Sequence, residues 1–185
     1  MGRVHTTELV FATVWTVFWI YWIVAALSTK RGRVAWSHEL RIRALVIVLA
    51  VLVLRTRGLR NSDHLPAPWR VGLGFALFAF GLGFAVWARL NIGRNWGHPM
   101  SKKDDSELVT SGPYQLVRHP IYFGILMAGV GTAVALNWTW LIATALAGVY
   151  FVYSATVEER HLTERFPEAY PAYKRTTKML VPFIF

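Results

Sequence analysis

The chain has 185 residues, 55% of them hydrophobic and 15% aromatic, with a net charge of +10 and no cysteine. A soluble domain of this composition would have too few polar side chains to cover its surface, whereas lipid solvates the outside of a membrane protein. The absence of cysteine excludes disulfides and thiolate metal sites. The basic residues stand mostly at the ends of apolar segments, and this placement indicates contact with lipid headgroups and no nucleic-acid partner.

Three transmembrane helices are predicted in residues 1–90. The first runs from Leu9 to Leu27, an uncharged stretch that nearly crosses a hydrocarbon layer of about 30 Å at about 1.5 Å per residue. The second, Ala44–Leu54, is short, but arginines on both sides can snorkel to the interfaces and extend it to about Leu40–Leu59. The third runs from about Val71 to Leu90 and contains small positions that let a neighbouring helix approach closely, namely Gly72, Gly74, Gly81 and Gly83.

The longest apolar run, Ile121–Val157, has no charged residue. As one helix it would be roughly 55 Å long, nearly twice the thickness of the hydrocarbon layer. We therefore expect it to fold back at Asn137, Trp138 and Trp140 and to form a hairpin of the fourth and fifth spans.

Five spans place the two termini on opposite sides of the membrane. Lys and Arg cluster in the first loop, the third loop and the tail, which predicts that these segments are cytoplasmic and that the N-terminus lies outside, although the second loop also carries arginines. The sequence thus predicts an all-α polytopic protein of the cell's inner or plasma membrane, built as a single domain over residues 1–185.

A polar stretch, Glu107–Gly124, precedes the longest apolar run. Pro120 fits the first position of a helix, where its missing N–H costs nothing. The free N–H groups of a helix start, with the guanidinium of Arg118 beside them, predict an anion-binding site to which His119 and Tyr122 are close. The alternative is that Arg118 and His119 are interfacial anchors that precede a span.

Glu158 and Glu159 follow the apolar run directly. Carboxylates so close to the hydrocarbon boundary are disfavoured unless they are hydrated or paired. Because the hairpin returns the fifth span to the side where the fourth begins, we expect the two glutamates to lie near Arg118 and His119. The alternative is that they begin a hydrated amphipathic helix, which would end at Phe166 because a residue before proline leaves helical geometry.

Other polar residues are less specific. His5 and His161 have no partners at metal-ligand spacing, so we predict no metal site. Asn91, Asn95 and His98 either line the same membrane face or are ordinary loop residues, and the chain has no glycine-rich phosphate loop or nucleophile elbow.

The motifs of the second half resemble a known family. SGPYQLVRHPIYFG at residues 111–124 is followed, after the hairpin, by EERHLTERFPEAYPAYKR at residues 158–175 and by LVPF at residues 180–183. This set resembles the isoprenylcysteine carboxyl methyltransferase family and the related phospholipid N-methyltransferases. The resemblance covers about residues 91–185, which would form the methyltransferase core.

The resemblance implies an integral membrane enzyme that uses S-adenosylmethionine, bound by the last two spans and the segments that flank them. It implies catalytic roles for Arg118, His119 and Glu159. It implies a cofactor-binding set composed of Leu108, Val109, Gly112, Tyr114, His119, Pro120, Tyr122, Glu158 and Glu159.

The chemistry of these side chains agrees with that cofactor. Its sulfonium and ammonium groups favour nearby carboxylates, and its own carboxylate favours Arg118 and a helix N-terminus. Methyl transfer is an in-line displacement, in which the protein mainly aligns the reactants. A carboxylate acceptor is ionised at neutral pH and needs no base, whereas a thiol or amine needs one, for which His119 is the nearest candidate.

The acceptor is less well specified than the cofactor. Family members commonly carry a basic residue about one turn before the Glu pair, at a position linked to acceptor binding, whereas this chain has uncharged side chains at residues 153–156. We expect a lipophilic acceptor drawn from the membrane lipids, either an isoprenyl-cysteine-like carboxylate or another small lipid-like molecule. An amine acceptor, as in phospholipid N-methyltransferases, is an alternative.

Two further interpretations belong to other classes. An NADPH-dependent membrane reductase of the sterol-reductase type has a similar C-terminal half, but Pro120 and the Glu pair argue against it. A non-catalytic membrane scaffold is compatible with the first three spans but leaves the polar residues of the second half unexplained.

Overall fold

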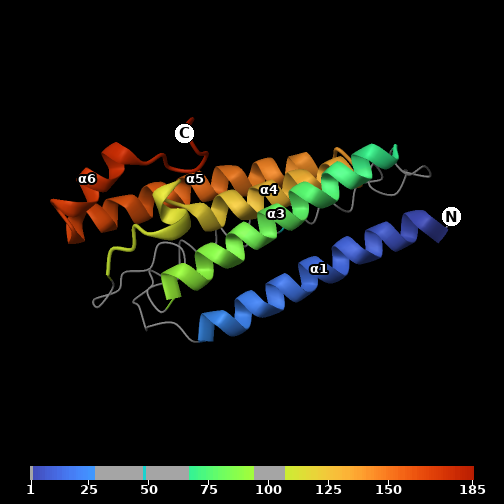
Figure 1. Cartoon of the computed structure of the whole chain (residues 1–185), viewed down its shortest axis with the longest axis horizontal. Coiled ribbons are helices and arrows are strands. Elements are labelled where there is room, and N and C mark those ends of the chain that lie inside the picture. Colours follow the sequence, from blue (N-terminus) through green and yellow to red (C-terminus); the bar gives the residue numbers. More distant parts are fainter. Residues whose placement is uncertain (1, 28–47, 49–66, 94–106) are drawn as a thin grey trace.

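The computed structural model describes residues 2–27, 48, 67–93 and 107–185, and the regular elements in these ranges are helices (Figure 1). They are α1 (Gly2–Leu27), α3 (Pro68–Ile92), the 3-10 turn η3 (Gly112–Gln115), α4 (Pro120–Ala135), α5 (Trp140–Arg165) and α6 (Ala169–Thr176). The prediction of an all-α fold is confirmed for this part of the chain.

Among the described helices, three are long and apolar enough to cross a membrane: α1 over Thr6–Ala25, α3 and α5. They correspond to the first, third and fifth predicted spans. Helix α4, with 16 residues, is shorter and extends about 24 Å. The second predicted span, Ala44–Leu54, lies outside the described residues apart from Val48.

Helices α4 and α5 form the predicted hairpin, and its turn lies at residues 136–139. The side chain of Asn137 fixes this turn, because its Oδ1 accepts hydrogen bonds from the backbone N–H of Thr139 (2.8 Å) and from the Thr139 hydroxyl (2.7 Å). The hairpin brings the end of α5 back to the start of α4, and α3 lies along α4 (Figure 1).

Helices α3 and α4 pack closely and antiparallel through glycines. A Cβ atom on Gly81 would lie 2.5 Å from the backbone nitrogen of Ala128, and one on Gly74 would lie 2.5 Å from the Cβ of Ala135. Gly124 of α4 is equally confined. The prediction that glycines admit a neighbouring helix is therefore confirmed for Gly74 and Gly81, whereas Gly72 and Gly83 have no atom within 4 Å of the position of a Cβ.

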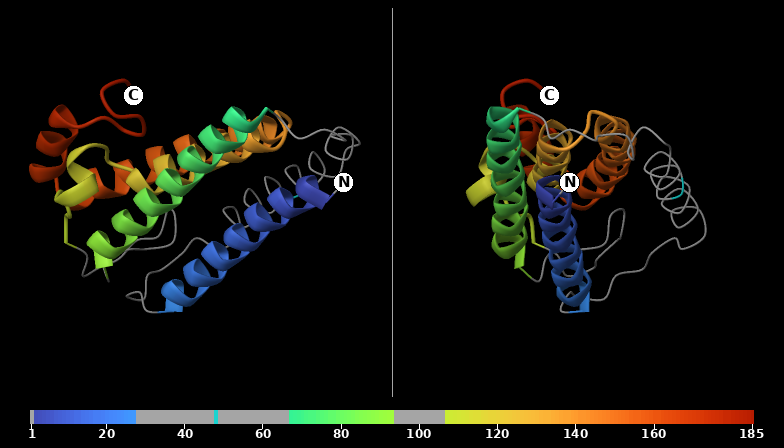
Figure 2. Two further views of the ribbon diagram at one scale, coloured as in Figure 1. Left: turned by 45° about the vertical axis from the view of Figure 1, so that its right-hand side comes forward. Right: turned by 90° about the vertical axis from the view of Figure 1, so that its right-hand side faces the viewer.

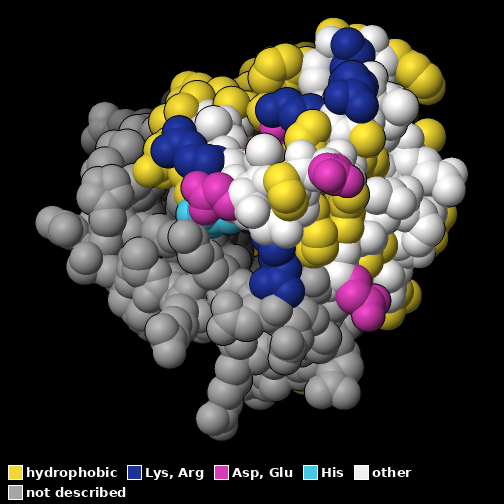
Figure 3. Space-filling model, turned by 90° about the vertical axis from the view of Figure 1, so that its left-hand side faces the viewer, with side chains coloured by type: hydrophobic (Ala, Val, Ile, Leu, Met, Phe, Trp, Pro, Cys, Tyr) yellow, Lys and Arg dark blue, Asp and Glu magenta, His cyan; other side chains and the backbone are white. Residues whose placement is uncertain are grey.

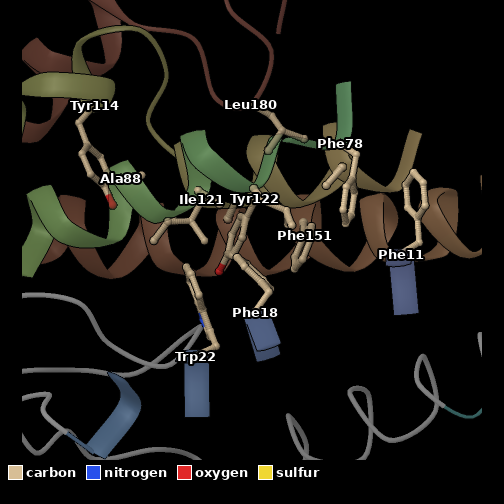
Figure 4. Packing of buried hydrophobic residues seen from close by; sticks show 14 of the residues in the cluster. Phe11, Phe18, Trp22, Phe78, Ala88, Tyr114, Ile121, Tyr122, Phe151 and Leu180 are labelled. Atoms are coloured by element: carbon tan, nitrogen blue, oxygen red, sulfur yellow. The ribbon is translucent and has the colours of Figure 1, made fainter. Parts of the chain in front are cut away.

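Helix α1 packs against α3 and α4 through aromatic side chains. The ring of Phe11 lies 4.5 Å from that of Phe78, and Trp15 donates a hydrogen bond from Nε1 to the buried hydroxyl of Thr132 (3.2 Å). Figure 4 shows Phe18 and Trp22 of α1 pointing toward the buried residues of α4. Many apolar side chains on the outer surface are exposed, as expected where lipid replaces water.

Arg89, a buried arginine that the sequence did not single out, joins the ends of α1 and α3. Its guanidinium donates to the carbonyl oxygens of Ala25 (2.9 Å) and Gly93 (2.8 Å). Both carbonyls belong to helix ends, which lack partners within their own helices. Arg89 therefore fixes α1 against α3 at the end of the molecule that carries η3 and α6.

The segment after α5 folds back over this end of the helices (Figure 2). Its backbone pairs with the residues before α4: the amide of Arg118 donates to the carbonyl of Lys178 (2.9 Å), and the amide of His119 donates to that of Met179 (3.0 Å). Charged side chains of both signs gather on the same end, among hydrophobic ones (Figure 3). The fold thus places charged and polar side chains together at one end of an apolar helical bundle.

Candidate active site

The two halves of the predicted site meet at the start of α4 and the end of α5. Glu159 Oε1 lies 2.6 Å from Nε of Arg118 and 3.5 Å from Nε2 of His119, and Glu158 Oε2 lies 3.5 Å from Nδ1 of His119. The prediction that the hairpin brings these four residues together is confirmed. They are about forty residues apart in sequence, and the hairpin formed by the uncharged residues 121–157 brings them together.

Glu159 is buried among cationic groups, with only 3% of its surface exposed. Besides Arg118, its carboxylate contacts Lys174 of α6, whose Nζ lies 2.8 Å from Oε2. A buried carboxylate is tolerated only when charge and hydrogen bonds compensate its lost hydration. Lys174 was not among the residues predicted for the site, because an exposed lysine in a basic tail carries no signal of its own.

Glu158 has different neighbours and is more accessible, with 24% of its side chain exposed. Its Oε1 accepts hydrogen bonds from the hydroxyls of Tyr122 (2.6 Å) and Ser154 (3.3 Å), which lie 3.1 Å from each other. Ser154 was not predicted either, although it stands one helical turn before Glu158 and so on the same face of α5. The carboxylate of Glu158 is thus oriented by neutral donors and by His119.

His119 stands at the N-terminal cap position of α4 between the two carboxylates. Its ring stacks parallel to that of Tyr122 at 5.4 Å, and the Tyr122 ring stacks on Phe151 at 4.4 Å. Burial lowers the pKa of His119. Its interactions with Glu158 and Glu159 raise the pKa by more than burial lowers it, so the net shift is upward. The ring is therefore held rigidly and favours its protonated form.

Arg118 and the start of α4 form a different arrangement from the predicted anion site. The guanidinium donates to Glu159 and, through Nη1, to the carbonyl oxygen of Thr177. The amides of Arg118 and His119 donate to the tail, as described above. The guanidinium, which the sequence suggested for an external anion, instead contacts a glutamate and the backbone of the protein's own tail.

The predicted cofactor strip, residues 108–114, has no regular structure over residues 108–110, is extended at Ser111 and continues into η3. Leu108 and Val109 are half-buried, and Gly112 has φ +59°, where a Cβ would lie 2.7 Å from Oδ1 of Asn91. Asn91, on the last turn of α3, donates from Nδ2 to the carbonyl of Ser111 (2.9 Å). Asn91 therefore holds the strip, whereas Asn95 and His98 lie outside the described residues.

Tyr114 closes the strip and joins it to α6. Its ring is buried, and its carbonyl accepts a hydrogen bond from the hydroxyl of Tyr173 (2.5 Å). Burial raises the pKa of Tyr173 to about 12, so this hydroxyl stays protonated and donates. Beside this contact is an open depression of about 380 Å³, lined by Thr110, Gln115, Ala172, Tyr173, Thr176 and Thr177.

Two polar atoms in this region are buried without a hydrogen-bond partner in the described part of the chain. They are Nε2 of His119 and the hydroxyl of Tyr170, a residue that is 1% exposed. Buried polar groups are normally satisfied, and exceptions often mark a ligand position. The partly exposed carboxylate of Glu158 suits a positively charged group, and Nε2 of His119 and the Tyr170 hydroxyl can donate to acceptor atoms of the same ligand.

Comparison with known proteins shows similarity to membrane methyltransferases. The family described as phospholipid methyltransferase matches residues 69–169. The chain is 36% identical over 121 residues to a protein-S-isoprenylcysteine O-methyltransferase of Xenopus laevis, an alignment that covers 63% of this chain and 42% of that protein. It is 30% identical over 146 residues to a methanethiol S-methyltransferase of a Pseudomonas species, covering 74% of this chain and 56% of the relative.

A further relative is named for a different process. The chain is 33% identical over 151 residues to the cobalt-zinc-cadmium resistance protein CzcN of Cupriavidus metallidurans, which covers 69% of this chain and 68% of that protein. Among solved structures, a eukaryotic intramembrane Ras methyltransferase, isoprenylcysteine carboxyl methyltransferase, matches with a TM-score of 0.61 at 23% identity over 81% of this chain and 55% of that one. The chain spans about half the length of the isoprenylcysteine methyltransferases that it matches.

Proposed function

Because the chain belongs to the phospholipid methyltransferase family, we propose that it is an integral membrane enzyme that transfers a methyl group from S-adenosylmethionine to a lipophilic acceptor. The observation that carries this proposal is the convergence of Glu158, Glu159, Arg118 and His119 at one end of an apolar bundle. A scaffold would have no need of buried charges there, since each costs hydration that must be compensated.

The residues present fit the proposed cofactor. When bound, S-adenosylmethionine supplies a methyl group activated by a sulfonium cation. Glu158 offers a partly exposed carboxylate to positive charge, and the unpartnered atoms of His119 and Tyr170 offer further polar contacts. The half-buried Leu108 and Val109 offer apolar surface on the opposite strip.

The contribution of the protein to the reaction is alignment and exclusion of water. Tyr122 is held between the rings of His119 and Phe151, and its hydroxyl fixes one oxygen of Glu158. Such rigidity keeps the carboxylate of Glu158 in a single orientation. A carboxylate fixed in this way can hold the methyl donor in the alignment that an in-line displacement requires. The apolar side chains around Tyr122 limit the access of water that would compete with the acceptor.

The state of His119 bears on the class of acceptor. The two carboxylates raise the pKa of His119, so the ring holds its proton more tightly than a free histidine does and is less available as a general base. This favours an acceptor that is already anionic, which supports the carboxylate of an isoprenyl-cysteine-like or other small lipid-like molecule. An amine or thiol acceptor is the alternative. It would need a general base, and His119 would then have to act in its neutral form.

Calorimetry with S-adenosylhomocysteine tests the proposal on the detergent-purified protein. We expect the unmodified chain to bind, and Glu158→Gln to weaken binding by tenfold or more, on the order of 1.4 kcal/mol. Glu168→Gln, on an exposed residue just before α6, is the matched control and should bind like the unmodified chain. Absence of binding by the unmodified chain, or binding of NADPH in its place, would overturn the proposal.

The acceptor is identified by a separate experiment. Membrane lipid extracts are incubated with methyl-labelled S-adenosylmethionine and the protein, and labelled products are identified by mass spectrometry. A labelled methyl ester would support a carboxylate acceptor, whereas a labelled amine or thioether would assign the chain to the alternative class.

A further inference from the structure

Lys174 joins α6 to the buried end of α5. We propose that Lys174 is a positioning residue: by pairing with Glu159 it fixes the C-terminal strap, residues 169–180, against the cofactor strip, and it thereby sets the affinity for the methyl donor. This inference rests on the proposed function, and it assigns Glu159 to positioning, where the sequence suggested a catalytic role.

The first argument is the isolation of Glu159 from solvent. Its side chain is 4% exposed, and its two oxygens are taken up by Arg118 (2.6 Å) and Lys174 (2.8 Å). A carboxylate with both oxygens in short ion pairs has little capacity left for a ligand. Glu158, which is six times more exposed and is held by hydroxyls, is the carboxylate of the pair that faces outward.

The second argument is that three separate segments meet at Glu159. Arg118 comes from the segment before α4, Lys174 from α6, and Glu159 itself from α5. Arg118 also donates to the carbonyl of Thr177, so the same guanidinium contacts both the glutamate and the strap. The three charged groups therefore form a connected network that holds the strap on the hairpin.

The third argument concerns the neighbour of Lys174. Tyr173 donates its hydroxyl to the carbonyl of Tyr114 in the cofactor strip, while Lys174 reaches Glu159. Two adjacent strap residues thus contact the two halves of the proposed site, the strip and the glutamate pair. A shift of the strap at Lys174 would move Tyr173 and with it the strip.

Lys174 is a favourable position for a test because its side chain is 51% exposed. Replacing it removes no core packing, so folding should persist. The variants are Lys174→Met, the conservative Lys174→Arg, and Arg175→Met as the matched control on the exposed neighbour. Hydrogen exchange of peptides from residues 169–180 reports the strap, and calorimetry with S-adenosylhomocysteine reports the affinity.

We expect Lys174→Met to speed exchange in the strap and to weaken binding by about tenfold. The melting temperature should fall, because Glu159 loses one partner, but the fold should persist because Arg118 still pairs with Glu159. Lys174→Arg should restore exchange and binding, since it keeps the charge, and Arg175→Met should alter neither. In a Glu159→Gln background, adding Lys174→Met should change strap exchange little further, because the partner is already absent.

The inference is overturned if Lys174→Met exchanges and binds like Arg175→Met, or if the two substitutions at Glu159 and Lys174 act additively. Failure of the proposed function has a different signature. In that case the unmodified chain binds no S-adenosylhomocysteine, while the exchange of the strap still shows whether Lys174 holds it.

Discussion

At the scale of single residues, the adjacent glutamates at the end of α5 have unlike surroundings. Glu159 is buried between Arg118 and Lys174, whereas Glu158 is partly exposed and accepts hydrogen bonds from two hydroxyls. The difference arises because consecutive helical residues point about 100° apart. One carboxylate faces the strap and the other faces the rings of Tyr122 and His119.

The position of His119 between them predicts a pH dependence of stability. Its pKa is raised in the folded protein above the ordinary value of about 6.5, so the folded state binds the proton more tightly than the unfolded state does. The resulting stabilisation is fully present below the unfolded pKa and is lost as the pH rises through the folded pKa. We expect the melting temperature in detergent to fall over that range.

His119→Asn, which does not titrate, provides the comparison. The difference in melting temperature between the unmodified chain and this variant should shrink as the pH rises. A proton-NMR titration of the histidine ring gives the folded pKa directly. A midpoint below about 6.5 would contradict the prediction.

Sequence reasoning identified the residues of the site whose neighbours are fixed by chain connectivity. Arg118, His119 and the two glutamates flank an uncharged run too long for one span, so a hairpin had to bring them together. Lys174 and Ser154 could not be found in this way. Their roles depend on how α6 folds back and on which face of α5 meets α4, and neither a serine nor a lysine is unusual where they stand.

At the scale of helices, the contact between α3 and α4 shows the same limit. Four glycines were candidates, but only Gly74 and Gly81 face α4. They are separated by two helical turns and so share a face, whereas Gly72 and Gly83 are each two residues away and point about 200° from it. The sequence alone does not show which face meets a partner. It also did not show that α4 would be a short, largely buried helix.

These glycines provide a matched test of packing. A Cβ on Gly81 would lie 2.5 Å from backbone atoms of Gly124 and Ala128, which cannot move without separating the helices. We expect Gly81→Ala to destabilise the protein by about 1–3 kcal/mol. Gly83→Ala meets no atom within 4 Å and should be neutral or stabilise by up to about 1 kcal/mol, because alanine favours the helix.

Equilibrium unfolding in mixed micelles measures both variants. Equal stabilities for Gly81→Ala and Gly83→Ala would show that α3 and α4 are not in close contact. Lower stability for Gly83→Ala than for Gly81→Ala would mean that the opposite face of α3 carries the contact.

At the scale of the whole molecule, the candidate active site lies at one end of the helical bundle and the hairpin turn lies at the other. Helix α3 begins near the hairpin turn and ends near η3, and α6 covers the same end as η3 (Figure 1). We propose that the end with α6 faces the cytoplasm, because Lys and Arg cluster in the tail. The turn of the hairpin then faces outward.

The absence of native cysteine allows this orientation to be tested without background labelling. Ala67→Cys places a thiol at the exposed start of α3, and Glu168→Cys places one beside α6. With a membrane-impermeant maleimide, intact cells should label Ala67→Cys, and Glu168→Cys should react only after the membrane is opened. The unmodified chain, which has no thiol, is the blank. The reverse pattern would place the candidate active site outside the cell, and labelling of both positions in intact cells would show that these two ends of the bundle do not lie on opposite sides of the membrane.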